Sequence, residues 1–182
     1  MIHRNRQNGF TLAELLVSVA VASIVLTVAA PSWESLTLNN RQVTSVNELV
    51  GLFHFARTEA VTRNRQVTLC PSADGANCAA TPWQSGAIVF IDGDNDRTVG
   101  PGETILRVSS ALDAVDISTA NFAQVLVFRS NGRISTGVVG VNSGQFTLCD
   151  RRGAEHARVI VMEISGRPHA SGKQTDGSDP TC

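Results

Sequence analysis

The spacing of hydrophobic residues divides this chain of 182 residues into three stretches. From Leu12 to Ala30 nearly every side chain is apolar or small, and Glu14 carries the only charge. As a helix these 19 residues are about 28 Å long, close to the roughly 30 Å hydrocarbon core of a bilayer. The first stretch therefore predicts a helix that can cross a membrane once.

The residues ahead of this helix indicate its orientation. Residues 1–9 are polar, and Arg4 and Arg6 are their only charged side chains. Positive charge favours the cytoplasmic side, so the chain after the helix is expected on the outer side of the membrane. A secretory signal peptide also has a basic start and an apolar run. The length of the run, its acidic residue and the lack of an obvious cleavage site before a mature start argue against that alternative.

In the second stretch, residues 32–65, apolar residues recur every three or four positions. This spacing predicts an amphipathic helix that packs one face on a sheet. The charged side chains Arg41, Glu48, Arg57 and Arg63 fall outside that face. The face is formed by Val43, Val46, Val50, Phe53, Ala56 and Ala60.

The third stretch changes to short β-rich runs separated by Gly, Asn, Asp and Pro. Asn131-Gly132 is a strong hairpin signal, and residues 165–182, with little apolar material, are expected to form a loop. One long helix followed only by short strands predicts an α+β head with an antiparallel sheet, not an alternating βαβ enzyme core. Strands are expected at residues 66–70, 87–92, 104–109, 125–129, 145–149 and 158–164.

Composition and charge exclude several classes of protein. The chain has 15 Lys and Arg against 16 Asp and Glu, a formal net charge of −1, and 42% hydrophobic residues. Uniformly basic nucleic-acid-binding chains and wholesale disorder are therefore excluded. The four histidines are scattered, and neither a G-x-S-x-G nor an H-E-x-x-H motif is present. We expect no catalysis and no cofactor.

Glu14 is the unusual residue of the apolar helix. A carboxylate deep in a bilayer costs about 2.5 kcal/mol or more, so it needs a partner unless it lies at the headgroup interface. The sequence around it, Gly9-Phe-Thr-Leu-Ala-Glu-Leu-Leu-Val17, resembles the prepilin signature of type IV pilins and type II secretion pseudopilins. That resemblance supplies a partner for Glu14.

In this family a prepilin peptidase cuts after the glycine, so the resemblance implies cleavage between Gly9 and Phe10 and methylation of Phe10. It also implies that Glu14 pairs with the N-terminal amine of a neighbouring subunit during filament assembly. Pro31 stands where family members often carry a helix-kinking proline. The expected segments are a leader of residues 1–9, a transmembrane and filament-core helix of residues 10–31, an amphipathic helix of residues 32–65 docked on the head, and a β-rich periplasmic head of residues 66–182 with a C-terminal loop.

Residues 55–65 resemble the end of the long helix in the subgroup of minor pilins and pseudopilins called GspH, FimT and FimU. The resemblance implies the type IV pilin fold and a minor pilin, at the pilus tip or in the assembly-priming complex, that supports pilus biogenesis. Its expected location is the inner membrane, with a single span, and then the pilus (fimbrium). Its expected partners are the prepilin peptidase and other minor and major pilins. A type II secretion pseudopilin is the alternative.

Four cysteines allow three disulfide connectivities in an exported head. Nearness in sequence favours a Cys70–Cys78 pair, and a cysteine at the end of a loose tail favours a Cys149–Cys182 tether. The second pair also resembles FimU, in which a strand cysteine is joined to one at the tail end. The spacing does not support a zinc site.

The acidic stretch from Asp92 to Glu103 has the carboxylate spacing of a calcium loop, with Asp94 and Asp96 at its third and fifth positions. Arg97 occupies the sixth position, where an EF-hand needs Gly, and the flanks predict strands instead of helices. We expect a solvated loop without a metal, and calcium binding is the alternative.

A cluster of basic residues near the C-terminus is a candidate phosphate-binding surface. It resembles the C-terminal part of FimT, which binds DNA in some bacteria through a Gly-Arg-x-Arg motif. Here Gly166 and Arg167 are kept, and His169 replaces the second Arg. A structural or subunit-pairing role is the other interpretation. The candidate DNA-binding residues are Arg151, Arg152, Arg158, Arg167, His169 and Lys173.

Overall fold

The computed structural model describes residues 10–122, 124–135, 141 and 143–182. The chain divides into two compact units, one ending at Asn39 and the other running from Asn40 to Cys182. A single helix, α1 (Leu12–Arg63), contributes to both units. No break in the helix separates the predicted segments 10–31 and 32–65, and that division stays a prediction. Pro31 lies inside α1, and the kink expected there also stays a prediction.

The ends of α1 are set by local capping. At the start, the Glu14 backbone amide donates to Oγ1 of Thr11 at 3.2 Å, so Thr11 acts as the N-cap. At the end, Asn64 adopts a left-handed conformation with φ 51°, and the Arg65 amide donates to the Ala60 carbonyl at 3.2 Å. Such a left-handed residue is a common way for a helix to stop.

The second unit contains two antiparallel sheets. The five-stranded sheet has the order β3-β2-β1-β5-β6, and the four-stranded sheet has the order β4-β7-β8-β9. The strands are β1 (Val67–Pro71), β2 (Ala87–Ile91), β3 (Ile105–Ser109), β4 (Asp116–Ala120), β5 (Leu126–Phe128), β6 (Ile134–Ser135), β7 (Gly144–Cys149), β8 (Arg158–Met162) and β9 (Pro168–Ser171). Two short 3-10 helices occur in the connections: Trp83–Ser85 comes between β1 and β2 in the sequence, and Ala154–His156 comes between β7 and β8.

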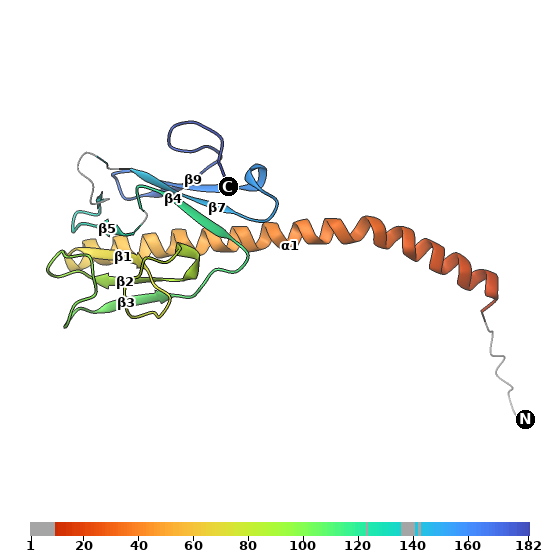
Figure 1. The fold of residues 1–182 in the computed structure, drawn as a ribbon, viewed down its shortest axis with the longest axis horizontal. Coiled ribbons are helices and arrows are strands. Elements are labelled where there is room, and N and C mark those ends of the chain that lie inside the picture. The colour runs from red at the N-terminus through yellow and green to blue at the C-terminus, as the bar shows by residue number, and fades with distance from the viewer. Residues whose placement is uncertain (1–9, 123, 136–140, 142) are drawn as a thin grey trace, which may run out of the picture. The chain divides into compact units, whose positions relative to one another are not determined.

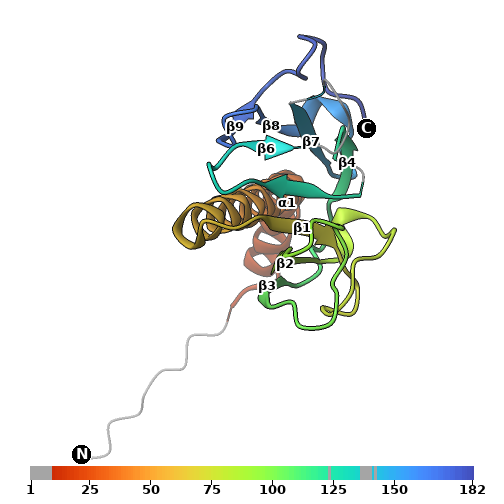
Figure 2. The same cartoon turned by 90° about the vertical axis from the view of Figure 1, so that its left-hand side faces the viewer.

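The C-terminal half of α1 lies between the two sheets (Figures 1 and 2). The core combines side chains from the helix and from both sheets, and Phe146 of β7 lies in an aromatic cluster at its centre. Its ring centroid is 4.9 Å from Phe53 of the helix, 5.1 Å from Trp83 and 5.3 Å from Phe122. The Trp83 indole N–H donates to the Phe122 carbonyl at 2.9 Å, so this buried polar group is satisfied.

The predicted helix face is buried at Phe53, Ala56 and Ala60 and differs from the prediction only toward its N-terminal end. Val43 is exposed, whereas Gln42 and Ser45 are buried together with Leu49 and Leu52. Two polar side chains can be buried here because both are hydrogen-bonded. Nε2 of Gln42 donates to the Leu148 carbonyl of β7 at 3.2 Å, and the Ser45 hydroxyl donates to the Arg41 carbonyl at 3.0 Å.

Charged residues beside that face also hold the helix to the sheets. Glu48 accepts a hydrogen bond from the Ser109 hydroxyl at the end of β3 at 2.8 Å. Nε of Arg57 donates to the Gly132 carbonyl, next to β6, at 3.2 Å. The helix is therefore fixed to the five-stranded sheet at both of its edges.

Every strand expected from the sequence is present to within a few residues, and three further strands were missed. The tail prediction is wrong for β9, because residues 168–171 pair with β8 instead of forming a loop. β8 would otherwise be an unpaired edge, and the pairing satisfies its backbone groups. The Asn131-Gly132 hairpin is confirmed: it joins β5 to β6, and Gly132 takes the left-handed conformation with φ 75°.

A substitution at Gly166 tests the contact where the two sheets adjoin. Gly166 has φ 70°, and an added Cβ would lie 2.2 Å from the Gly132 carbonyl oxygen. Nearby, the Ile134 amide of β6 donates to the Ile164 carbonyl at 3.2 Å. We expect Gly166→Ala to lower the free energy of unfolding by about 2–4 kcal/mol, through backbone strain and overpacking. Urea unfolding followed by tryptophan fluorescence measures this.

The matched control is Gly172→Ala, where an added Cβ meets nothing within 4 Å. Equal stability of the two variants would contradict the proposed close approach at Gly166.

Candidate functional site

Residues 10–17 of the prepilin-like sequence lie at the start of α1. Gly9 lies outside the described residues, and Phe10 is the first residue described, with 82% of its surface exposed. Thr11 and Glu14 form the Thr-x-x-Glu pattern of a capping box, which places Glu14 in the first turn of the helix. A carboxylate in that position is also favoured by the helix dipole.

The Glu14 carboxylate is available to a partner outside the chain. It is exposed, and no cation or hydrogen-bond donor among the described residues contacts it. A helix-capping role would be enough to explain Glu14 if its carboxylate stayed in water. It would not offset the cost of placing that carboxylate in an apolar environment.

The helix that follows is apolar on every side. The stretch beginning at Leu12 is long and apolar enough to cross a membrane, and none of that stretch is buried. Its hydroxyl groups need no outside partner: Ser18, Ser23 and Thr27 donate to the Glu14, Ala20 and Ile24 carbonyls of their own helix at 2.7–2.8 Å. Such internal satisfaction is what a helix in lipid requires. The large exposed side chains are Leu12, Leu15, Leu16, Val17, Val19, Val21, Ile24, Val25 and Leu26.

Both disulfides of the head have the expected pairing. Cys70 at the end of β1 is joined to Cys78, and Cys149 at the end of β7 is joined to Cys182. The first bridge belongs to a small second core on the outer face of β1 and β2, with Ile88 and Phe90. The second closes a loop of 33 residues and ties the C-terminal tail to the four-stranded sheet. By loop entropy the two bridges contribute roughly 2.5 and 4 kcal/mol.

The pairing of β8 with β9 separates two of the candidate DNA-binding residues, Arg158 and Arg167. In the antiparallel pairing of β8 and β9, Pro168 faces Met162 at one end and Ser171 faces Val159 near the other. Arg167, which precedes Pro168, is therefore at the opposite end of this ladder from Arg158, roughly 17 Å along the strands. His169 lies between the two ends, opposite Val161.

Carboxylates engage Arg152 and Lys173 among the candidate basic residues. Arg152 forms a bidentate ion pair with Asp150, with 2.6 Å between Nη2 and Oδ2. Lys173 pairs with Asp179 at 2.5 Å. The side chain of Asp150 is only 1% exposed, and the Arg152 hydrogen bond holds its pKa below the ordinary value. These pairs reduce the positive charge available to a phosphate backbone.

The structure brings three of the four candidate calcium ligands together. Carboxylate oxygens of Asp92, Asp94 and Asp96 all lie within 4.8 Å of one another. Glu103 is not part of that group. It closes the loop instead, because its two oxygens accept the Gly93 amide at 2.6 Å and the Gly100 amide at 3.0 Å.

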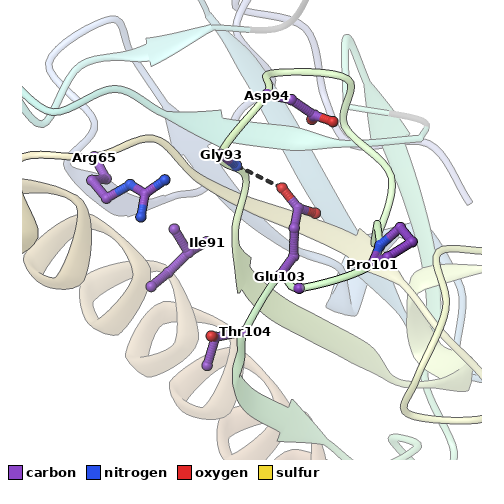
Figure 3. A pocket seen from close by; sticks show the side chains of 8 residues that line it. Arg65, Ile91, Gly93, Asp94, Pro101, Glu103 and Thr104 are labelled. Atoms are coloured by element: carbon purple, nitrogen blue, oxygen red, sulfur yellow. Dashed lines mark hydrogen bonds between the residues drawn. The ribbon is translucent and has the colours of Figure 1, made fainter.

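Figure 3 shows the Glu103 carboxylate pointing at the Gly93 backbone, while Asp94 at the loop tip points away from Arg65. The loop has two left-handed residues, Asn95 and Arg97, with φ 66° and 68°. Arg97 thus takes the conformation for which glycine is preferred at the sixth position of a calcium loop. Hydrogen bonds from the backbone amide and hydroxyl of Thr98 hold the pKa of Asp96 below its ordinary value.

Sequence reasoning missed the residues that organise this loop from outside it. Gln66 and Thr68 precede it by more than twenty positions and both donate to Oδ2 of Asp92, at 2.9 and 2.7 Å. A polar Thr in the middle of the β-rich run 66–70 was the available signal. Its partner could be found only once β1 was paired with β2.

A helix that is apolar on all sides at its start and packed between antiparallel sheets at its end defines the pilin class of protein. Sequence comparison then gives the family. Residues 4–30 match the prokaryotic N-terminal methylation motif, and residues 45–166 match the model of the type II transport protein GspH. Because the second match covers more than half of the chain, the protein belongs to the GspH family.

Solved structures share this fold. The type IV minor pilin FimU of Pseudomonas aeruginosa, in one crystal form, aligns with a TM-score of 0.58 and 18% identity over 79% of this chain and 96% of FimU. A second crystal form gives 0.54 and 18% over 76% and 98%. The minor pseudopilin EpsH from the type 2 secretion system of Vibrio cholerae aligns with 0.48 and 7% over 72% and 96%. No curated protein sequence matches significantly.

The chain is thus a minor pilin or pseudopilin of a type IV pilus or a type II secretion system. The methylation motif implies processing by a prepilin peptidase and assembly with other pilins. A helix that can enter the inner membrane and later a filament is consistent with that life history. Pilins are structural proteins, which agrees with the expectation that this chain is not an enzyme.

The buried Asp150–Arg152 pair predicts a pH-dependent stability. Because the folded-state pKa of Asp150 is lowered, the stabilisation is present above the unfolded pKa, about 3.9, and is lost as the pH falls through the folded value. We expect Asp150→Asn to cost about 2 kcal/mol of unfolding free energy at pH 7. The difference from wild type should shrink as the pH falls below about 4. Urea unfolding at several pH values measures both effects.

Asp113→Asn, which removes an exposed carboxylate, is the control and should leave stability unchanged. A cost for Asp150→Asn that is the same at pH 3 and pH 7 would contradict an electrostatic origin.

Proposed function

We propose that this chain is a minor type IV pilin that is cleaved after Gly9, methylated at Phe10 and incorporated at the pilus tip or in the assembly-priming complex. The observation that carries the proposal is the first half of α1. It is apolar on all sides, and the one carboxylate at its start has no partner among the described residues. Such a helix is complete only when lipid or other helices surround it.

The energetics favour other pilin helices as the final surroundings. Each large apolar side chain removed from water contributes about 1.5–3 kcal/mol, and lipid and a filament core both supply that term. The two environments differ in what they offer the Glu14 carboxylate. Lipid offers the carboxylate no cation, whereas a neighbouring subunit offers the positive amine of its own processed Phe10. A charge-assisted hydrogen bond between the two offsets the cost of burying Glu14 and fixes the axial register of the subunits.

Two features support a pilus over a secretion machine. The head has the fold of FimU, which is a type IV minor pilin, and it ends in a disulfide between a strand and the last residue, which resembles FimU. The family description names type II transport, so a GspH-like pseudopilin for protein secretion is the alternative. The DNA-receptor alternative gains no support, because Arg158 and Arg167 lie at opposite ends of the β8–β9 ladder and Arg152 and Lys173 are paired with carboxylates.

Deleting the gene distinguishes the two machines. We expect the deletion to reduce surface pili several-fold and to leave protein secretion unchanged, because a minor pilin acts in pilus initiation. Electron microscopy counts the pili, and a plasmid copy of the wild-type gene should restore them. Normal piliation together with a secretion defect would overturn the proposal in favour of the pseudopilin.

A substitution at Glu14 tests the assembly role separately. We expect Glu14→Gln to be cleaved and inserted into the membrane normally but recovered in sheared pili at least about tenfold less than wild type. A tenfold loss corresponds to about 1.4 kcal/mol of lost pairing. Immunoblots of membrane and pilus fractions measure the ratio.

Ser18→Ala is the matched control one turn along the helix, because the Ser18 hydroxyl bonds only to its own helix. Wild-type recovery of Glu14→Gln in pili would show that the carboxylate has no partner in the filament.

A further inference from the structure

One carboxylate oxygen in the head is buried without a hydrogen-bond partner. Asp92 follows β2 and is only 1% exposed. Its Oδ2 accepts hydrogen bonds from Thr68 and Gln66, at 2.7 and 2.9 Å, whereas Oδ1 has no donor in the part of the chain that the structure describes. Leaving a buried polar atom unsatisfied is costly, and more so for a charged group.

Asp92 belongs to a group of three carboxylates. Asp94 and Asp96 bring carboxylate oxygens to within 4.8 Å of one another and of Asp92. No arginine, lysine or histidine of the described residues forms an ion pair with any of the three.

We propose that Asp92, Asp94 and Asp96 bind one Ca²⁺ ion in the loop between β2 and β3. A calcium ion takes six to eight oxygens at 2.3–2.6 Å, so two of its ligands are at most about 5 Å apart. The separation in this loop falls inside that limit. Magnesium is a poorer candidate, since it requires a tighter octahedron at 2.0–2.1 Å and gives up its water reluctantly.

The surrounding contacts fit this assignment. Gln66 and Thr68 hold Oδ2 of Asp92, which orients the carboxylate and leaves Oδ1 for the ion. Glu103 accepts two backbone amides and closes the loop without using the ion.

Calcium would tie the exposed loop tip, with Asp94 and Asp96, to a buried residue anchored on β1. The same loop contributes Val99 to the cover of the second core. The ion would therefore stabilise that core as well as the loop. This role is independent of whether the filament is a pilus or a secretion pseudopilus.

The test is calcium titration of the full chain in detergent micelles after removal of metals with a chelator. Two of the three carboxylates are exposed, so we expect one site with a Kd of about 10⁻⁴–10⁻³ M, in the range of extracellular modules. At 10 mM CaCl₂, chosen as about 10–100 times that Kd, the melting temperature should rise by about 5 °C. Equal MgCl₂ should give a much smaller rise.

Variants separate binding from folding. Asp92→Asn and Asp94→Asn should each weaken calcium binding at least tenfold and remove the thermal shift. Asp94 is exposed, so its variant serves if Asp92→Asn fails to fold. Asp113→Asn, with an exposed carboxylate outside the loop, should respond as wild type does.

Three results would overturn the proposal. They are no calcium-dependent heat or thermal shift in the wild type, an equal response to magnesium, and an unchanged calcium affinity in Asp94→Asn.

Discussion

The first half of α1 exposes apolar side chains in every direction, and this surface has to be removed from water. No sheet or loop of the chain covers it among the described residues. Its cap and hydroxyl groups are nevertheless hydrogen-bonded within the helix, since Thr11 caps the first turn and the hydroxyls of Ser18, Ser23 and Thr27 bond to helix carbonyls. The Glu14 carboxylate, by contrast, has no partner among the described residues. A membrane, followed by a bundle of identical or related helices, meets both requirements.

The second half of the same helix is covered by the head. It buries one face between two sheets and uses polar side chains, Gln42 and Glu48 among them, to fix its position. Two disulfides add covalent links to the head. One covers the outer face of β1 and β2, and the other fastens the tail through Cys182. Such bridges persist outside the cytoplasm, which agrees with a head exposed beyond the inner membrane.

Features encoded by local sequence could be predicted. Features that depend on contacts between strands or side chains far apart in the sequence could not. The apolar run, the prepilin motif and the Asn131-Gly132 turn are local. β4 and β9 were missed because neither has an alternating apolar pattern, and each is a strand only because it completes a ladder with β7 or β8. At one position of the predicted helix face, Val43 is exposed and Gln42 is buried in its place, since its amide meets the Leu148 carbonyl. The unsatisfied oxygen of Asp92 likewise depends on side chains from another strand.

The claim that this chain is a pilus subunit is tested most directly by mass spectrometry of pili sheared from cells that express it at its natural level. We expect it to be present, far below the major subunit, as a chain that begins with N-methylated Phe10. Removal of nine residues from 182 leaves 173 in that mature form. Finding the mature chain only in the inner membrane, with none in the pili of a normally piliated strain, would contradict the account.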